Sequence, residues 1–353
     1  MDALTDHSLD SLQRLLIDWR HLPVHSRRLL HSLYRTNGDP DYASRQLPRT
    51  LRDRLSAELP PRQAQVVRRH VSRDGTVKLL LGYASGGTVE SVLMPAYDDR
   101  RAAGCISSQI GCAMGCDFCA TATSGLVRNL TPGEIIEQFL QLRREAEALG
   151  RRLSTLVFMG QGEPLHNFDA VVESIRRFTH PALGNLGPRA ITVSTVGVVP
   201  AIDRLAAEGL GVHLALSLHA PDDETRSGIV PLNRKYPVAD VMAAARRYQD
   251  ETRRIVNVEY CLLAGVNDSD DHAVRLAKLM DGFRAHVNVI PHNPVSRTLS
   301  GRHYAAPPPE RVERFLATLC RAGIVAHRRR QRGDDITAAC GQLRQTSLPV
   351  LSD

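Results

Sequence analysis

The chain has 353 residues, of which 42% are hydrophobic and 24% charged, a composition typical of globular proteins. This length allows one large α/β barrel together with a small additional domain. No run of about 18 apolar residues occurs, and the N-terminal region lacks the apolar core of a secretion signal. We therefore expect a cytoplasmic protein without a membrane span, in which clustered cysteines stay reduced and serve metal binding or catalysis.

The basic residues are strongly biased towards arginine. The net charge is +7, and the chain has 42 arginines against three lysines, Lys78, Lys235 and Lys278. Guanidinium groups bind phosphate with paired hydrogen bonds, and a positive field attracts nucleic acid. The codon usage of a GC-rich genome also explains such a bias, so charge alone gives RNA or DNA binding only modest support.

The first part of the chain predicts helices followed by a hairpin. Within residues 1–75, apolar residues recur three and four positions apart in SLDSLQRLLIDWRHL and HSRRLLHSLYRT, which predicts a small helical unit. Within residues 76–98, two apolar runs flank Ser85-Gly86-Gly87, which predicts a β-hairpin.

From about residue 104, strand-like and helical segments alternate, and this rhythm predicts a parallel sheet covered by helices. The expected strands lie at 103–111, 154–160, 190–196, 211–219, 255–263 and 286–293. The expected helices lie at 132–149, 168–179, 199–208, 238–252, 270–283 and 308–322. Six such units fit an open or partial (β/α) barrel over residues 99–325, with a doubly wound sheet as the competing topology. Residues 326–353 then supply a last strand, a cysteine-bearing segment and a polar tail.

Four of the seven cysteines lie within residues 105–119. Cys112, Cys116 and Cys119 form a C-x3-C-x2-C motif, and three thiolates in one short loop can hold a metal centre. Zinc and two-iron sites usually take four protein ligands. A four-iron cluster with three cysteine ligands leaves one iron open, whereas a zinc knuckle or three buried thiols is the alternative.

The remaining cysteines separate into two kinds. Cys261 and Cys320 fall inside an apolar strand and an apolar helix, and we expect both to be small buried hydrophobic residues. Cys105 and Cys340 lie outside the C-x3-C-x2-C motif and are far apart in the sequence.

The cysteine motif, placed after a first barrel strand and with Phe118 between its last two cysteines, resembles that of radical S-adenosylmethionine (SAM) enzymes. This resemblance implies a [4Fe-4S] cluster on Cys112, Cys116 and Cys119, with the amino and carboxylate groups of SAM on the open iron. It also implies SAM contacts from strand ends. These are Gly162 and Glu163 in MGQGEP, Ser194 in VSTVG, Ser217, Leu218 and His219 in SLH, and Asn293 in IPHNP.

Six longer stretches resemble the RlmN/Cfr family of radical SAM RNA methyltransferases. They are CISSQIGC, MGQGEPLHN, SLHAPDDETR, PLNRKYP, AGVNDS and GDDITAACGQL, and the similarity covers roughly residues 76–343. The resemblance implies an α/β fold with a partial (β/α)6 radical SAM barrel at 99–325. It also implies an N-terminal helical accessory domain for RNA recognition (1–75), a β-hairpin extension with Glu90 (76–98) and a C-terminal catalytic-cysteine segment (326–353).

The family chemistry uses two SAM molecules and a cysteine that carries the methyl group. By resemblance, the first SAM methylates Cys340, and the second is cleaved to a radical that abstracts hydrogen from that methyl group. The carbon then adds to an adenine ring carbon. Glu90 would accept the proton from the ring, and Cys105 would release the product by forming a transient disulfide with Cys340.

The implied substrate is an adenosine of 23S ribosomal RNA, methylated at carbon 2, with transfer RNA as an additional target. We expect a monomer that receives electrons from a flavodoxin or ferredoxin. Arg328 to Arg330 and Arg332 are candidates for phosphate contacts beside the Cys340 segment. The alternatives are carbon-8 methylation as in Cfr-type antibiotic resistance, a radical SAM enzyme with a non-RNA substrate, and a non-catalytic RNA- or zinc-binding protein.

Overall fold

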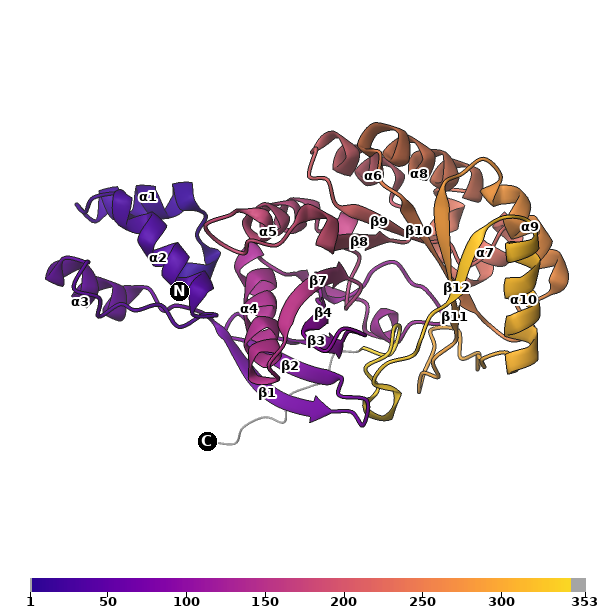
Figure 1. The fold of residues 1–353 in the computed structure, drawn as a ribbon, viewed down its shortest axis with the longest axis horizontal. Helices are drawn as coiled ribbons and strands as arrows, with labels where there is room; N and C mark the ends of the chain where they lie inside the picture. Colours follow the sequence, from indigo (N-terminus) through magenta and orange to yellow (C-terminus); the bar gives the residue numbers. More distant parts are fainter. Residues whose placement is uncertain (1, 344–353) are drawn as a thin grey trace.

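A computed structural model describes residues 2–343, and the tail expected at 344–353 lies outside the described residues. A small helical unit projects from a larger α/β body (Figure 1). It contains α1 (Leu9–Asp18), α2 (Val24–Arg35) and α3 (Arg49–Glu58), as the apolar periodicity predicted. Leucines of these helices belong to the same hydrophobic core as the sheet, so the unit is packed onto the body.

The body is built on one ten-stranded sheet with the order β1-β2-β3-β4-β7-β8-β9-β10-β11-β12. The strands are β1 (Ala64–Val71), β2 (Val77–Tyr83), β3 (Thr88–Pro95), β4 (Arg101–Cys105), β7 (Arg152–Phe158), β8 (Ile191–Thr195), β9 (His213–Ser217), β10 (Val256–Leu262), β11 (Ala285–Pro291) and β12 (Val325–Arg328). Neighbours from β1 to β4 are antiparallel, and neighbours from β4 to β12 are parallel. Because the parallel strands follow chain order without reversal, the sheet is a partial barrel and not a doubly wound sheet.

Helices cover the outer face of the parallel strands (Figure 1). They are α4 (Pro132–Ala148), α5 (Phe168–Thr179), α6 (Val199–Ala207), α8 (Val238–Thr252), α9 (Asp270–Met280) and α10 (Pro309–Arg321). A further short helix, α7 (Asp223–Ile229), packs Ile229 against the cysteine loop at Cys116 and Phe118. The sequence predicted all of these except the short α7, which Asp222 caps by accepting a hydrogen bond from the Thr225 N–H at 2.9 Å. None of the helices in the described part of the chain is long and apolar enough to cross a membrane.

The prediction of a single strand at 103–111 is wrong, because this stretch contains parts of two separate strands. β4 ends at Cys105, whereas β5 (Gln109–Gly111) pairs with β6 (Leu126–Asn129) in a second sheet. Between them, the side-chain amide of Gln138 on α4 accepts from the Ser107 N–H at 2.8 Å and donates to the Ser107 carbonyl at 2.9 Å. This amide satisfies the backbone groups that a neighbouring strand would otherwise pair.

Strand β1 was not predicted, because residues 1–75 were expected to be helical throughout. Seven of its eight residues are exposed, so the sequence shows no apolar alternation there. β1 forms through backbone pairing with the buried strand β2 and extends the sheet beyond the predicted hairpin of β2 and β3.

A buried carboxylate on α4 joins the helical unit to the body. Glu137 accepts hydrogen bonds from the Thr5 hydroxyl at 2.6 Å and the Gln63 N–H at 2.8 Å, and a further one from the Ala64 N–H. Burial raises the pKa of Glu137 to about 7. The carboxyl group therefore holds the first residues of the chain and the start of β1 against the same helix.

We expect Glu137→Ala to lower the free energy of unfolding of the helical unit by about 3 kcal/mol, because three buried donors lose their acceptor. Trp19 follows α1 and is the single tryptophan, so its fluorescence in urea reports this unit. Glu145→Ala is the control, since Glu145 on the same helix only forms a partly exposed ion pair with Arg69. Equal urea midpoints for the two variants would contradict the assigned role.

Candidate active site

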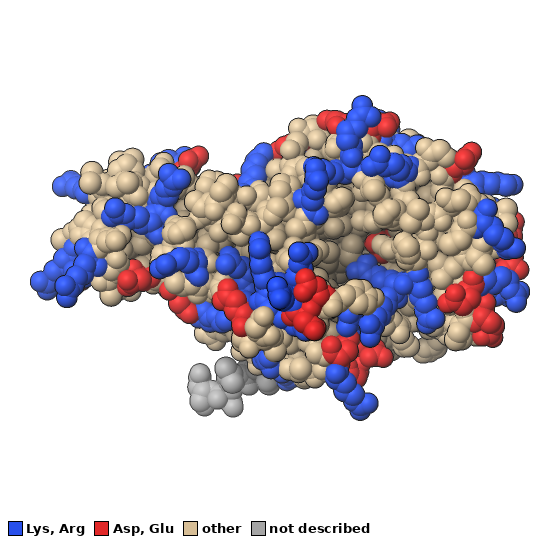
Figure 2. Space-filling model, in the orientation of Figure 1, with Lys and Arg blue, Asp and Glu red and all other residues tan. Residues whose placement is uncertain are grey.

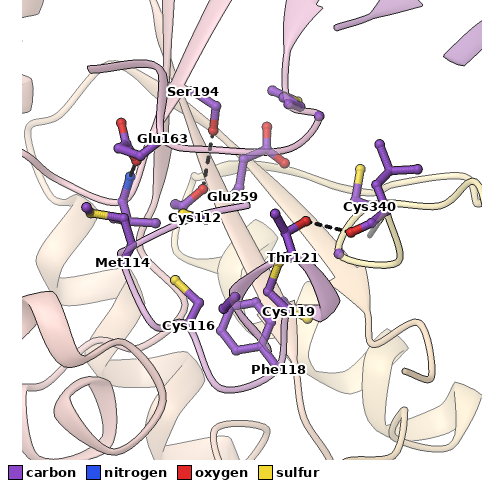
Figure 3. A pocket seen from close by; sticks show the side chains of 18 of the residues that line it. Cys112, Met114, Cys116, Phe118, Cys119, Thr121, Glu163, Ser194, Glu259 and Cys340 are labelled. Carbon is purple, nitrogen blue, oxygen red and sulfur yellow. Dashed lines mark hydrogen bonds between the residues drawn. The ribbon is translucent and has the colours of Figure 1, made fainter. Parts of the chain in front are cut away.

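The three motif cysteines line one pocket at the carboxyl ends of the barrel strands, which we call the main pocket (Figure 3). Burial raises the pKa of Cys112 to about 12 and also raises the pKa of Cys116 and Cys119. A nearby positive centre is therefore needed before these thiols ionise. Within residues 2–343, no three His, Cys, Asp or Glu side chains are grouped as the ligands of a metal ion.

The cysteine loop is fixed from outside by Asp117. Its carboxylate accepts hydrogen bonds from the Ser300 N–H at 2.7 Å, the Ser300 hydroxyl at 2.5 Å and the Tyr304 hydroxyl at 2.6 Å. Its own N–H donates to the Ile229 carbonyl at 2.9 Å. Segments on two sides thus hold the loop between Cys116 and Cys119 in place.

Gly162 and Glu163, expected to contact SAM, both line the main pocket. Gly162 has a φ of +97°, and a Cβ there would lie 2.6 to 2.8 Å from atoms of Gln109, so only glycine fits. Glu163 is buried and accepts from the Leu165 N–H at 3.0 Å and the Val196 N–H at 2.9 Å. Burial raises the pKa of its carboxyl group to about 7.

Three further predicted residues line the same pocket. Ser194 and Ser217 end neighbouring strands, and their hydroxyl oxygens are 3.4 Å apart. His219 accepts a hydrogen bond from the Cys261 N–H through Nδ1 at 3.0 Å, so its proton is on Nε2. Burial lowers the pKa of His219 to about 3, which keeps the ring neutral, and the Phe118 ring packs nearly perpendicular to it with the ring centroids 4.8 Å apart.

Two predicted SAM contacts lie outside the main pocket. Leu218 is fully buried in the core, and its N–H donates to the Glu259 carbonyl at 3.1 Å. Asn293 lines a neighbouring pocket, where its amide donates to the Cys340 carbonyl at 2.9 Å and accepts from Gln331 at 2.6 Å. Asn293 therefore positions the Cys340 backbone.

Cys340 connects the main pocket to a second one, the thiol pocket, which is also lined by Cys105, Asn293 and Arg329. The two cysteines come from distant parts of the chain and share this pocket as free thiols; no disulfide joins any of the seven cysteines. Burial raises the pKa of Cys105 to about 12, and the neighbouring Cys340 raises it as well. On the face of the molecule shown in Figure 2, Lys and Arg side chains border a hollow.

Glu90 lies in neither of these pockets. It lines a third one, the extension pocket, whose lining includes Arg68, His70 and Lys78 of β1 and β2. Its buried carboxylate forms an ion pair with Lys78 at 2.9 Å. Val92 of β3 pairs with Cys105 of β4. Glu90 is two residues from Val92, so it shares a sheet face with Cys105.

The sequence interpretation missed an ion pair inside the barrel. Glu259 on β10 lines the main pocket and accepts from Asn288 at 2.9 Å and from Arg329 at 3.2 Å. In the sequence, Glu259 could have been recognised as a carboxylate within the apolar run IVNVEYCLL. Arg329, expected among the phosphate contacts, points inwards instead, and its pKa is raised by the nearby Cys340 and Glu259.

The two cysteines assigned to the core differ. Cys261 on β10 is buried, as predicted. The prediction for Cys320 is wrong, because its side chain is exposed on α10. The buried stripe of that helix includes Phe315 and Leu319, and Cys320 follows Leu319 by one position, which turns it away from the core.

Comparisons with known proteins identify the family of this chain. A model of the radical SAM superfamily matches residues 106–277. A probable dual-specificity RNA methyltransferase RlmN 1 of Opitutus terrae is 51% identical over 342 residues, covering 97% of this chain and 96% of that protein. The corresponding probable RlmN of Moorella thermoacetica is 45% identical and covers 96% of each chain.

A solved structure gives the same result. The crystal structure of a radical SAM methyltransferase from Sphaerobacter thermophilus matches with a TM-score of 0.91 and 45% identity, covering 98% of this chain and 99% of that one. Membership of the radical SAM superfamily implies a [4Fe-4S] cluster and SAM. The chain therefore belongs to the RlmN family of radical SAM enzymes and is a SAM-dependent RNA methyltransferase.

Proposed function

We propose that the protein methylates carbon 2 of an adenosine in 23S ribosomal RNA and, as a second target, in transfer RNA. The position of Cys340 carries the proposal, because it lines both the main pocket and the pocket that holds Cys105. The relatives bear the name RlmN and the words "dual-specificity", which supports carbon 2 over the Cfr-type carbon 8 and supports two kinds of RNA.

Cys112, Cys116 and Cys119 are the ligands of the [4Fe-4S] cluster in this proposal. The three thiols line one pocket from a single loop and would supply the thiolate ligands that such a cluster requires. When bound, the cluster supplies the electron that cleaves SAM. Glu163, Ser194, Ser217 and His219 add polar groups to the pocket walls for the SAM molecule itself.

A cysteine that carries the methyl group solves a chemical difficulty. The target carbon lies between two ring nitrogens and is not a nucleophile, so a polar methyl transfer from SAM has no acceptor there. The thiolate of Cys340 is a competent acceptor. Arg329, held by Glu259, supplies positive charge beside it. Cys340 then delivers the carbon to the adenine ring as a thioether link.

Glu90 and Cys105 complete the reaction. Glu90 takes the proton from the ring carbon, and the ammonium group of Lys78 at 2.9 Å balances its buried charge. The thiolate of Cys105 attacks the sulfur of Cys340, and a disulfide forms as the sulfur–carbon bond to the RNA breaks. The electron pair of that bond passes to the adenine-bound carbon, which takes up a proton and becomes the methyl group. The shared thiol pocket supports this pairing.

The substrate is tested by mass spectrometry of nucleosides from 23S ribosomal RNA and from transfer RNA of a deletion strain. We expect 2-methyladenosine to disappear from both RNAs, because the proposed reaction is the source of the methyl group at carbon 2. Loss of 8-methyladenosine instead would assign carbon 8. An unchanged content of both nucleosides would show that the substrate assignment is wrong.

Variants that lack one of the two thiols are expected to stop the reaction at different steps. Cys340→Ala retains SAM cleavage and loses methyl transfer, since the carrier is missing. Cys105→Ala transfers the carbon but leaves RNA attached to Cys340, which mass spectrometry detects as a protein–RNA adduct. Cys320→Ala is the matched control, because this exposed thiol on α10 lies outside every pocket described above. Full methyl transfer by the Cys340 variant would refute the mechanism.

The cluster ligands are tested by anaerobic iron and sulfide analysis. We expect about four iron atoms per chain in the wild type. Alanine variants of Cys112, Cys116 and Cys119 each lose iron, whereas Cys261→Ala retains it although Cys261 lines the same pocket from β10. Zinc without sulfide in the wild type, or equal iron loss in the Cys261 variant, would contradict the ligand assignment.

A further inference from the structure

The extension pocket lies beside the two pockets that hold the proposed chemistry, and nothing above gives it a ligand. Its lining comes from three parts of the chain: the strands β1 to β3, the segment after β11, and the segment that leads to Cys340. The residues are Arg68, His70, Lys78, Leu80, Glu90, Ala120, Pro294, Val295, Ser296, Asp335, Ile336, Thr337 and Gln342.

The sheet register makes the floor of this pocket continuous with the thiol pocket. Partners directly opposite each other on antiparallel strands point to the same face. One row across the strands is His70, Lys78, Val92 and Cys105, and a second is Arg68, Leu80 and Glu90. With strands about 4.8 Å apart, the first row leads about 14 Å from Cys105 to the edge strand.

The outer end of this floor carries a guanidinium group and an imidazole ring that make no polar contact within residues 2–343. Arg68 and His70 are exposed on β1, and their side chains form no hydrogen bond or ion pair with another residue of the described chain. The inner cation, Lys78, is instead committed to Glu90 at 2.9 Å and to Thr337 at 3.1 and 3.2 Å. Among the described residues, Arg68 therefore offers an unpaired positive charge at the open side of the pocket.

The opposite wall is mixed in character. Pro294, Val295 and Ile336 are apolar, and planar base rings pack on such side chains. Asp335 also lines the pocket, but its carboxylate accepts from the Ser72 hydroxyl at 2.5 Å and the Arg73 N–H at 3.1 Å. These hydrogen bonds hold the Asp335 carboxylate against the turn between β1 and β2.

We propose that the extension pocket binds a nucleotide next to the target adenosine, with Arg68 and His70 on its phosphate. The inference rests on the proposed function, in which the target adenine reaches Cys340. An adenine that is modified on a ring carbon must leave its stack, so its neighbour in the strand is displaced as well. The floor from Cys105 to Arg68 and His70 gives that neighbour a path with anion-binding groups at its end.

The two faces of β1 provide a matched test. Arg68 points to the extension pocket, whereas Arg69 points the other way and pairs with Glu145 at 2.9 Å. The probe is a short RNA hairpin with an adenosine in its loop, measured by fluorescence anisotropy over a range of salt concentrations. We expect Arg68→Ala to weaken binding about tenfold. The slope of log affinity against log salt falls in magnitude by about 0.7.

Arg69→Ala removes the same charge one residue away and is expected to leave affinity and slope within about twofold of the wild type. In methylation assays Arg68→Ala raises KM for RNA and leaves kcat and RNA-independent SAM cleavage unchanged. Equal losses for the Arg68 and Arg69 variants would mean a non-specific charge effect and would overturn the site, as would full affinity of the Arg68 variant.

Photo-cross-linking locates the nucleotide directly. A hairpin with 4-thiouridine beside the adenosine is expected to cross-link to peptides from residues 64–83, 294–296 or 335–337. Cross-links confined to the helical unit at 9–58 would overturn the assignment. If the wild type methylates no RNA while Arg68→Ala still binds the hairpin more weakly than Arg69→Ala, the proposed function fails and the binding surface stands.

Discussion

The placement of Cys340 depends on residues 329–343, in which the described regular structure is a single helical turn, Asp334–Ile336. Polar contacts from separate parts of the fold fix it, including three hydrogen bonds to its backbone carbonyls. Lys78 donates to the Thr337 carbonyl at 3.1 Å, Asn293 donates to the Cys340 carbonyl at 2.9 Å, and the Ala120 N–H donates to the Gly341 carbonyl at 2.8 Å. These donors belong to the antiparallel extension, the end of β11 and the cysteine loop. The extension is therefore as much a part of the site as the barrel.

Two buried polar side chains hold the strand ends that face the main pocket. Arg226 is fully buried, and its guanidinium donates to the carbonyls of Leu218 at 2.9 Å and Val196 at 2.6 Å. Asn267 donates to the carbonyl of His219 at 2.7 Å, where φ is +62°. A buried charge is tolerated only with its hydrogen bonds satisfied, so these residues fix the loops in one conformation. The motifs SLHAPDDETR and AGVNDS thus act largely by positioning neighbouring residues.

The sequence predicted the barrel because its strands are short apolar runs and its helices have one apolar stripe, and both patterns are visible in the order of residues. It failed at β1, whose exposed residues carry no such pattern and whose pairing depends on β2. The ion pair of Glu259 with Arg329 was missed for a related reason. It joins β10 to the residue after β12, with β11 between them in the sheet, and no local pattern of residues reports such a pairing.

The electrostatics of the thiol pocket favour a fixed order of events in the proposed chemistry. Burial and, second to it, a negative charge on Cys340 raise the pKa of Cys105 to about 12, although Arg329 acts in the opposite direction. Two neighbouring thiolates are therefore disfavoured while both cysteines are free. Once Cys340 carries a carbon substituent, it is a neutral thioether. It then no longer raises the pKa of Cys105. Arg329 is then left to favour the Cys105 thiolate, so the resolving step becomes easier only after the carrier has been loaded.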